Sequence, residues 1–99
     1  MSAIELAAEV GEDFDRILDH LTTHEAGNPV LRIRAIIEAI NVLEHNPQIG
    51  RPASAGKREL VIGHGSRGYV ALYRYVDEID TVFVLAIRSQ RESGYAERG

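Results

Sequence analysis

Two stretches near the end of the chain, residues 69–76 and 81–91, are rich in Val, Ile, Tyr and Phe. The segment between them, residues 77–80, is acidic and has the composition of a turn. Because β-branched and aromatic residues favour strands, this pattern predicts two antiparallel strands joined by a short loop. We expect the rest of the chain to be organised around this hairpin.

The length of the loop sets the pairing of the two strands, because side chains alternate between the two faces of a strand. The face expected to form the core carries the pairs Val76 with Thr81, Arg74 with Phe83, Leu72 with Leu85 and Val70 with Ile87. The other face carries Tyr75 with Val82, Tyr73 with Val84, Ala71 with Ala86 and Tyr69 with Arg88. Two helices cover one face of a small sheet, so we expect this tyrosine face to stay exposed for a partner.

The N-terminal half changes from a strand pattern to a helical one. Residues 3–6 alternate as in a short strand, and from about residue 7 to 23 the spacing is that of an amphipathic helix. Its apolar stripe holds Leu6, Val10, Phe14, Ile17, Leu18 and Leu21, and its polar side is expected to hold Glu9, Glu12, Asp13, Asp15, Arg16 and Asp19. Gly27, Asn28 and Pro29 end this helix and start a second one, which we expect to continue to Asn46 and Pro47.

The remaining segments complete the predicted fold. Residues 46–57 lack periodicity and predict a long loop, residues 58–62 a strand, and residues 63–68 a glycine-rich turn. The fold class is therefore α+β: a short N-terminal strand, an α-helical hairpin and a three-stranded antiparallel meander (β-α-α-β-β-β), with the helices packed on one face of the sheet. We expect one domain over residues 1–99, with residues 92–99 as a flexible tail.

Composition and charge restrict the classes of function. The net charge is -4, and the asymmetry is large: residues 1–50 hold nine Asp or Glu and three Arg, whereas residues 51–99 hold six acids and eight Lys or Arg. A dedicated nucleic-acid binder usually carries a positive excess, so this balance argues against one. The absence of cysteine excludes disulfides and thiolate sites. Without an apolar run or a signal-peptide pattern, we expect a cytoplasmic protein without a membrane segment.

Short motifs give little support to cofactor or metal chemistry. Gly63, Gly65 and Gly68 match a dinucleotide fingerprint as a string, but a strand and not a helix is predicted to follow. His20 and His24 are four residues apart on a helix without an evident third ligand. No serine lies in a nucleophile elbow. We therefore expect no cofactor, no metal site and no hydrolase triad.

Basic and aromatic residues gather in the second half of the chain. The set is Lys57, Arg58, Arg67, Arg74, Arg88 and Arg91, together with Tyr69, Tyr73 and Tyr75. Such residues bind phosphates and stack on bases, and they are also the typical anchors of protein interfaces. Because the chain is acidic, the composition favours a protein partner over RNA.

Several of these segments together resemble the RelE/ParE superfamily of type II toxins. The resemblance depends on the order of the elements and on four segments: residues 43–52 (LEHNPQIGRP), residues 58–61 (RELV), residues 69–75 (YVALYRY) and residues 86–95 (AIRSQRESGY). It covers nearly the whole chain. The Asn-Pro-x-x-Gly-Arg-Pro signature at residues 46–52 is more typical of the ParE-like members.

The resemblance implies a toxin that inhibits growth, stabilises plasmids and is neutralised in a hetero-oligomeric complex by a cognate antitoxin with a DNA-binding domain. ParE-like members poison DNA gyrase through protein contact and are not enzymes, and the toxin alone would not bind specific DNA. The predicted antitoxin- and target-binding residues are Arg58, Tyr69, Tyr73, Tyr75, Arg88, Arg91 and Tyr95. RelE-like members instead cut mRNA on the ribosome, and that alternative would use Arg58, Arg88, Arg91 and Tyr95 as catalytic residues. A detoxified antitoxin-binding domain is a third possibility.

Overall fold

The computed structural model describes residues 1–24 and 27–95. The α-helices are α1 (Ala8–Thr23) and α2 (Pro29–Asn41), and the strands are β1 (Ala3–Leu6), β2 (Arg51–Pro52), β3 (Arg58–Ile62), β4 (Tyr69–Val76) and β5 (Thr81–Ser89). Single 3-10 turns lie at Val42–Glu44, Ser54–Gly56, Gly65–Arg67 and Asp77–Ile79. Residues 96–99, the end of the predicted flexible tail, lie outside the described residues.

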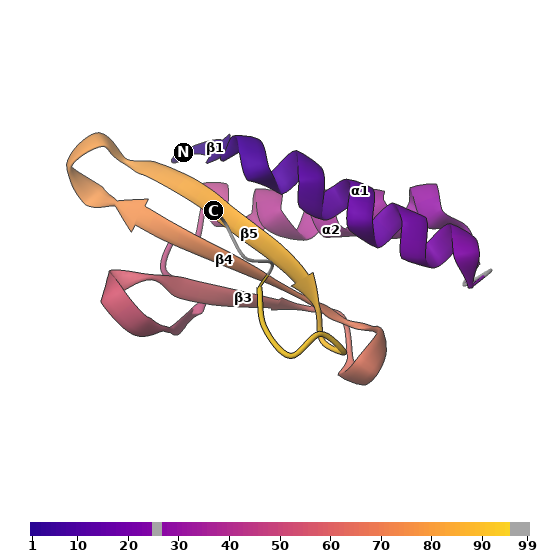
Figure 1. The fold of residues 1–99 in the computed structure, drawn as a ribbon. Helices are drawn as coiled ribbons and strands as arrows, with labels where there is room; N and C mark the ends of the chain where they lie inside the picture. Colours follow the sequence, from indigo (N-terminus) through magenta and orange to yellow (C-terminus); the bar gives the residue numbers. More distant parts are fainter. Residues whose placement is uncertain (25–26, 96–99) are drawn as a thin grey trace.

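The described strands form one five-stranded sheet in the order β1-β5-β4-β3-β2, and α1 and α2 pack on one face of it (Figure 1). The strands β3, β4 and β5 form the predicted antiparallel meander, and β1 lies beside β5 in parallel. This arrangement confirms the predicted fold class. The short strand β2, inside the predicted loop of residues 46–57, was not foreseen.

The start of α2 follows directly from its sequence. The side chain of Asn28 accepts hydrogen bonds from the backbone N–H groups of Val30 (3.1 Å) and Leu31 (3.2 Å), and Pro29 occupies the first turn, where no N–H is needed. The α-helix ends at Asn41, earlier than predicted, because residues 42–44 tighten into a 3-10 turn. This turn buries Leu43 and lets the Glu44 carbonyl accept the N–H of Ser2 at 2.8 Å.

The predicted pairing of β4 with β5 is correct near the loop of the hairpin and wrong farther from it. The pairs Val76–Thr81, Tyr75–Val82, Arg74–Phe83 and Tyr73–Val84 are confirmed, but a β-bulge then shifts the pairs to Leu72–Ala86, Ala71–Ile87, Val70–Arg88 and Tyr69–Ser89. The extra residue of a bulge displaces every later pair by one position. The bulge also moves Ile87 to the same face as the tyrosines.

The prediction that the tyrosine face stays exposed is wrong, because this face forms the core. Tyr69 is 7% and Tyr73 0% exposed, and both belong to the buried cluster beneath α1 and α2, with Tyr75 packed against it. Of the residues expected to anchor the core, Ile87 belongs to this cluster and Val70 is also fully buried. Leu72 and Leu85 are only partly buried. The tyrosines fit here because their hydroxyls reach polar partners: the Tyr73 hydroxyl accepts the Gly50 N–H (2.9 Å), and the Tyr75 hydroxyl donates to Asp80 (2.7 Å).

Candidate functional site

The face of the sheet opposite α1 and α2 is not covered by these helices, and we call it the helix-free face. Strand register places on it Glu59, Val61, Leu72, Arg74, Phe83 and Arg88. Val61 is 44% exposed, and Leu72 and Phe83 are partly exposed. The segment after β5 turns back and brings Tyr95 to this face.

Tyr95, Glu59 and Arg88 form the polar centre of the helix-free face. The Tyr95 hydroxyl donates to Glu59 Oε2 at 2.6 Å, and the Arg88 guanidinium lies 5.2 Å from the centre of the Tyr95 ring. Burial and the Glu59 hydrogen bond raise the pKa of Tyr95 well above its usual value. The same hydrogen bond, with help from Arg51, lowers the pKa of Glu59. Tyr95 is therefore a neutral donor and Glu59 an anion near neutral pH.

The side chain of Arg88 binds the backbone of the segment that follows β5. Its Nη1 donates to the carbonyls of Ser89 and Glu92, both at 3.2 Å. Its Nε is buried and has no hydrogen-bond partner among the described residues. Nη1 of Arg88 therefore holds the segment after β5 in place, and the role of Arg88 in binding a partner stays a prediction.

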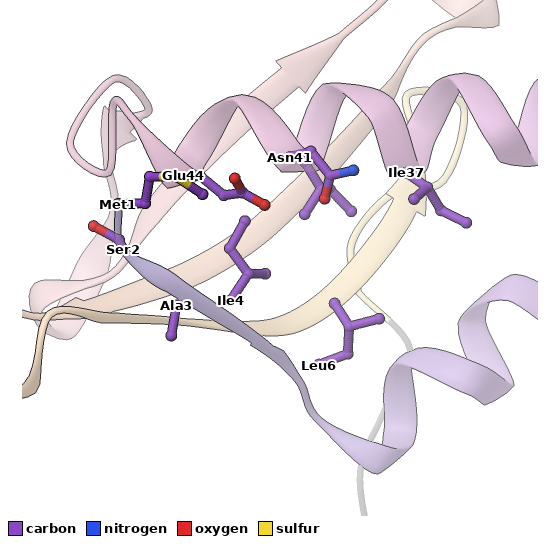
Figure 2. A pocket seen from close by; sticks show the side chains of 9 residues that line it. Met1, Ser2, Ala3, Ile4, Leu6, Ile37, Asn41 and Glu44 are labelled. Carbon is purple, nitrogen blue, oxygen red and sulfur yellow. The ribbon is translucent and has the colours of Figure 1, made fainter.

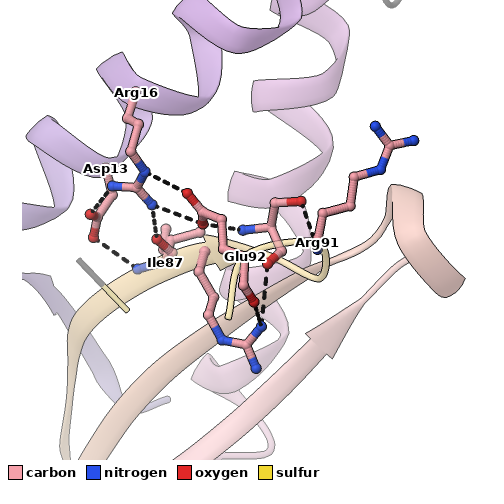
Figure 3. A network of polar contacts seen from close by, with 7 residues as sticks. Asp13, Arg16, Ile87, Arg91 and Glu92 are labelled. Atoms are coloured by element: carbon pink, nitrogen blue, oxygen red, sulfur yellow. Dashed lines mark hydrogen bonds and ion pairs between the residues drawn. The ribbon is translucent and has the colours of Figure 1, made fainter. Parts of the chain in front are cut away.

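A second polar network joins α1 to the end of β5, and it includes two residues that were expected on the outer side of α1. Asp13 is 0% exposed and accepts the Ile87 N–H at 2.9 Å, while Arg16 donates to the Ile87 carbonyl at 3.0 Å. Arg16 also pairs with Asp13 (2.7 Å) and with Glu92 (2.7 Å), as Figure 3 shows. The prediction that Asp13 and Arg16 face away from the sheet is therefore wrong.

The network has a clear structural reason. The short strand β1 pairs with β5 only as far as Leu6 and Val84, so the outer edge of β5 beyond that point lacks a neighbouring strand. The N–H and C=O of Ile87 would be unpaired there, and buried backbone groups need partners. The sequence carried one signal for this: Asp13 lies three residues after Val10 and four before Ile17, within the apolar stripe of the helix.

Arg58 and Arg91 have different environments. Arg58 donates to the carbonyls of Gly50 (2.8 Å) and Gln48 (3.2 Å) and so holds the loop before β2 against the sheet edge. Arg91 is exposed, and Figure 3 shows its guanidinium pointing away from the network around Arg16. Its side chain makes no hydrogen bond or ion pair with the described residues. Of the four arginine and tyrosine residues proposed for nuclease chemistry, Arg91 is the one whose side chain is free.

An apolar groove lies on the other side of the molecule, between β1 and α2 (Figure 2). Its volume is about 470 Å³, and it is lined by Met1, Ser2, Ala3, Ile4, Leu6, Ile37, Ile40, Asn41 and Glu44. Several of its hydrophobic residues are exposed, among them Leu6 at 52% and Ile37 at 42%. Exposed apolar surface of this kind favours association with another protein.

The remaining sequence motifs take structural roles. The rings of His20 and His24 stack 4.2 Å apart, and no three metal-ligating side chains come together among the described residues. Residues 65–67 form a 3-10 turn that leads into β4, so the glycine string is a strand-to-strand turn, as predicted. Within the described part of the chain, no helix is both long and apolar enough to span a membrane.

The fold and these surfaces define a small two-layer α+β protein with a helical hairpin over a mixed sheet. The chain belongs to the ParE toxin family: the model of the ParE toxin of the type II toxin-antitoxin system, parDE, matches residues 4–94. This match confirms the resemblance to the RelE/ParE superfamily.

Solved structures share the fold. A chain of the chromosomal ParDE toxin-antitoxin system from P. aeruginosa has a TM-score of 0.72 and 22% identity, with 90% of this chain and 96% of that chain covered. A chain of the RelBE2 toxin-antitoxin complex from Mycobacterium tuberculosis has a TM-score of 0.63 and 22% identity, with 90% of this chain and 98% of that chain covered. A chain of the intact RelBE toxin-antitoxin complex from E. coli has a TM-score of 0.62 and 16% identity, with 99% of this chain and 100% of that chain covered. No curated protein matches the sequence.

Proposed function

We propose that this toxin inhibits DNA gyrase by protein-protein contact and that a cognate antitoxin neutralises it. The ParE family match over residues 4–94 supports this proposal, and a ParDE system is among the similar structures. The antitoxin is expected to carry a DNA-binding domain and to be encoded beside the toxin.

The environment of Tyr95 is the observation that favours gyrase inhibition over mRNA cleavage. A nuclease would need this phenol as an acid or base and nearby cations for the phosphate. Here the hydroxyl already donates to the Glu59 carboxylate, and its raised pKa makes it a weaker acid than an ordinary tyrosine, while the neutral phenol is not a base. The Glu59 anion would also repel a phosphate at this position. These features favour a protein partner.

The helix-free face provides a suitable surface for the target. Val61, Leu72 and Phe83 offer apolar contact area, and Arg74 is exposed beside them. Tyr95 extends this surface after the end of β5. Arg91 lies instead on the helix side, where it lines a hollow with Ile17 and His20 of α1. Tyr69 and Tyr73, which the sequence suggested as contact residues, support it from the core instead. The groove between β1 and α2 is the corresponding candidate for the antitoxin, because its exposed apolar residues need a cover in solution.

A supercoiling assay with purified toxin and gyrase tests the proposal. We expect loss of supercoiling and trapped cleavage complexes, both reversed by the product of the neighbouring antitoxin gene. Full supercoiling at excess toxin would contradict it. Primer extension on translated mRNA identifies the alternative: codon-linked cuts would indicate a ribosome-dependent endoribonuclease. Normal growth on expression of the toxin alone, with neither effect, would indicate a detoxified antitoxin-binding domain.

A further inference from the structure

A second hollow, separate from the helix-free face, lies where the β3–β4 turn meets the start of α2. Its volume is about 330 Å³, and it is lined by Arg32, Ala35, Ile36, Ile62, Gly63, His64, Arg67 and Tyr69. The turn and the first residues of α2 lie at the same end of the sheet (Figure 1). Its floor consists of the core residues Ile36, Ile62 and Tyr69, and its rim carries the two arginines and the histidine.

The glycine string shapes this rim. Gly63 and Gly65 adopt positive φ angles of 77° and 54°, which side chains other than glycine rarely adopt. A Cβ on Gly68 would lie 2.7 Å from the Ile62 carbonyl oxygen. The turn is closed by a hydrogen bond from the Gly68 N–H to the Gly65 carbonyl (3.0 Å). The three glycines thus hold a tight turn that places His64 and Arg67 across from α2.

The charge of this rim is not compensated by the residues around it. No Asp or Glu lines the hollow. The side chains of Arg32, His64 and Arg67 make no hydrogen bond or ion pair with any residue that the structure describes. This is unusual in a chain of net charge -4 whose first 50 residues hold nine acids. Guanidinium groups above an apolar floor are suited to carboxylates carried on an otherwise apolar segment.

We propose that this hollow binds an acidic peptide segment of the antitoxin, with carboxylates on Arg32 and Arg67 and an apolar side chain over Ile36 and Tyr69. The inference depends on the proposed function in one respect, namely that an antitoxin binds this chain. Nucleic acid is the less suitable ligand, because a phosphate backbone needs a continuous row of cations and gains nothing from an apolar floor.

The first test is isothermal titration of the cognate antitoxin into the full-length toxin and three variants. Arg32→Gln and Arg67→Gln should each weaken binding about fivefold, and the loss should shrink at high salt. Arg34→Gln is the matched control, since Arg34 is exposed on the same helix but does not line the hollow. Wild-type affinity in both rim variants would overturn the inference. If the wild-type toxin fails to bind the antitoxin at all, the proposed function fails instead.

The second test does not depend on the antitoxin. Labelled toxin is titrated by NMR with a short synthetic peptide of glutamates around one leucine, with its glutamine counterpart, and with a single-stranded oligonucleotide of equal length. We expect shifts at Arg32 and in the β3–β4 turn for the glutamate peptide alone. Equal shifts with the glutamine peptide, no shifts, or larger shifts with the oligonucleotide would each overturn the proposal.

Discussion

The hydroxyl of Tyr95 donates a 2.6 Å hydrogen bond to Oε2 of Glu59, which lies 36 residues earlier in the chain. The other oxygen of Glu59 accepts from Arg51 Nε at 3.1 Å. One carboxylate therefore joins the segment after β5 to β3 and to the short strand β2. This relationship gives the first prediction.

We expect Glu59→Gln to lower the free energy of unfolding by about 1 kcal/mol at neutral pH. The folded state lowers the pKa of Glu59 from 4.5, chiefly through the Tyr95 hydrogen bond. Its contribution is thus fully present above that value and is lost as the pH falls through the folded-state pKa. Urea unfolding between about pH 7 and about pH 3 should show the gap between wild type and variant closing in acid.

The control for this prediction is Glu78→Gln, which changes an exposed acid in the β4–β5 loop. Its free energy of unfolding should stay within about 0.5 kcal/mol of wild type at neutral pH. A gap for Glu59→Gln that is equally large at both ends of the pH range would contradict the assignment.

Replacing Gly50 or Gly11 by alanine should change the stability of the protein in opposite directions. A Cβ at Gly50 would lie 2.7 Å from the Tyr73 ring and hydroxyl and 2.8 Å from the Glu59 carbonyl oxygen, so Gly50→Ala should destabilise by about 1–3 kcal/mol. Gly11 lies in α1 with open space around it, and Gly11→Ala should stabilise by about 0.5–1 kcal/mol. Thermal unfolding checks both. Similar changes in the two variants would rule out the close packing at Gly50.

The buried carboxylate of α1 should be a major stabilising group. Asp13→Ala leaves the Ile87 N–H and the Arg16 guanidinium without this partner, so we expect a loss of about 3 kcal/mol in the free energy of unfolding. Asp15→Ala changes an exposed acid on the same helix and should stay within about 0.5 kcal/mol of wild type. Chemical denaturation compares the two. Equal losses would mean that Asp13 does not support the edge of β5.

The helix-free face should decide gyrase inhibition. We expect Val61→Lys to raise the toxin concentration for half inhibition about tenfold, because it places a hydrated charge in the apolar part of the contact surface. Val42→Lys is the matched control, since Val42 is 45% and Val61 44% exposed, and Val42 follows α2, away from this face. Both variants should unfold like wild type. Unchanged inhibition by Val61→Lys would move the contact surface elsewhere.

The amino-acid sequence by itself determined α1, α2, every strand except β2, the fold class and the first four pairs of the hairpin. These follow from local information: apolar periodicity, the Asn28 cap with Pro29, and the acidic loop of residues 77–80. The family was also recognisable from short segments of the sequence, because such motifs can be identified without knowing the fold.

Only the tertiary structure decided which face of the sheet is buried. Both faces of the hairpin carry hydrophobic residues, and a single bulge between Leu72 and Tyr73 moved Ile87 to the tyrosine side. The hydroxyl of Tyr73 then found a partner in Gly50, 23 residues earlier, which no local pattern identifies. Asp13 likewise accepts the Ile87 N–H only because β1 ends before it could pair with Ile87. Burial and hydrogen-bond satisfaction depend on residues distant in the chain, and for that reason the candidate site could be located only in three dimensions.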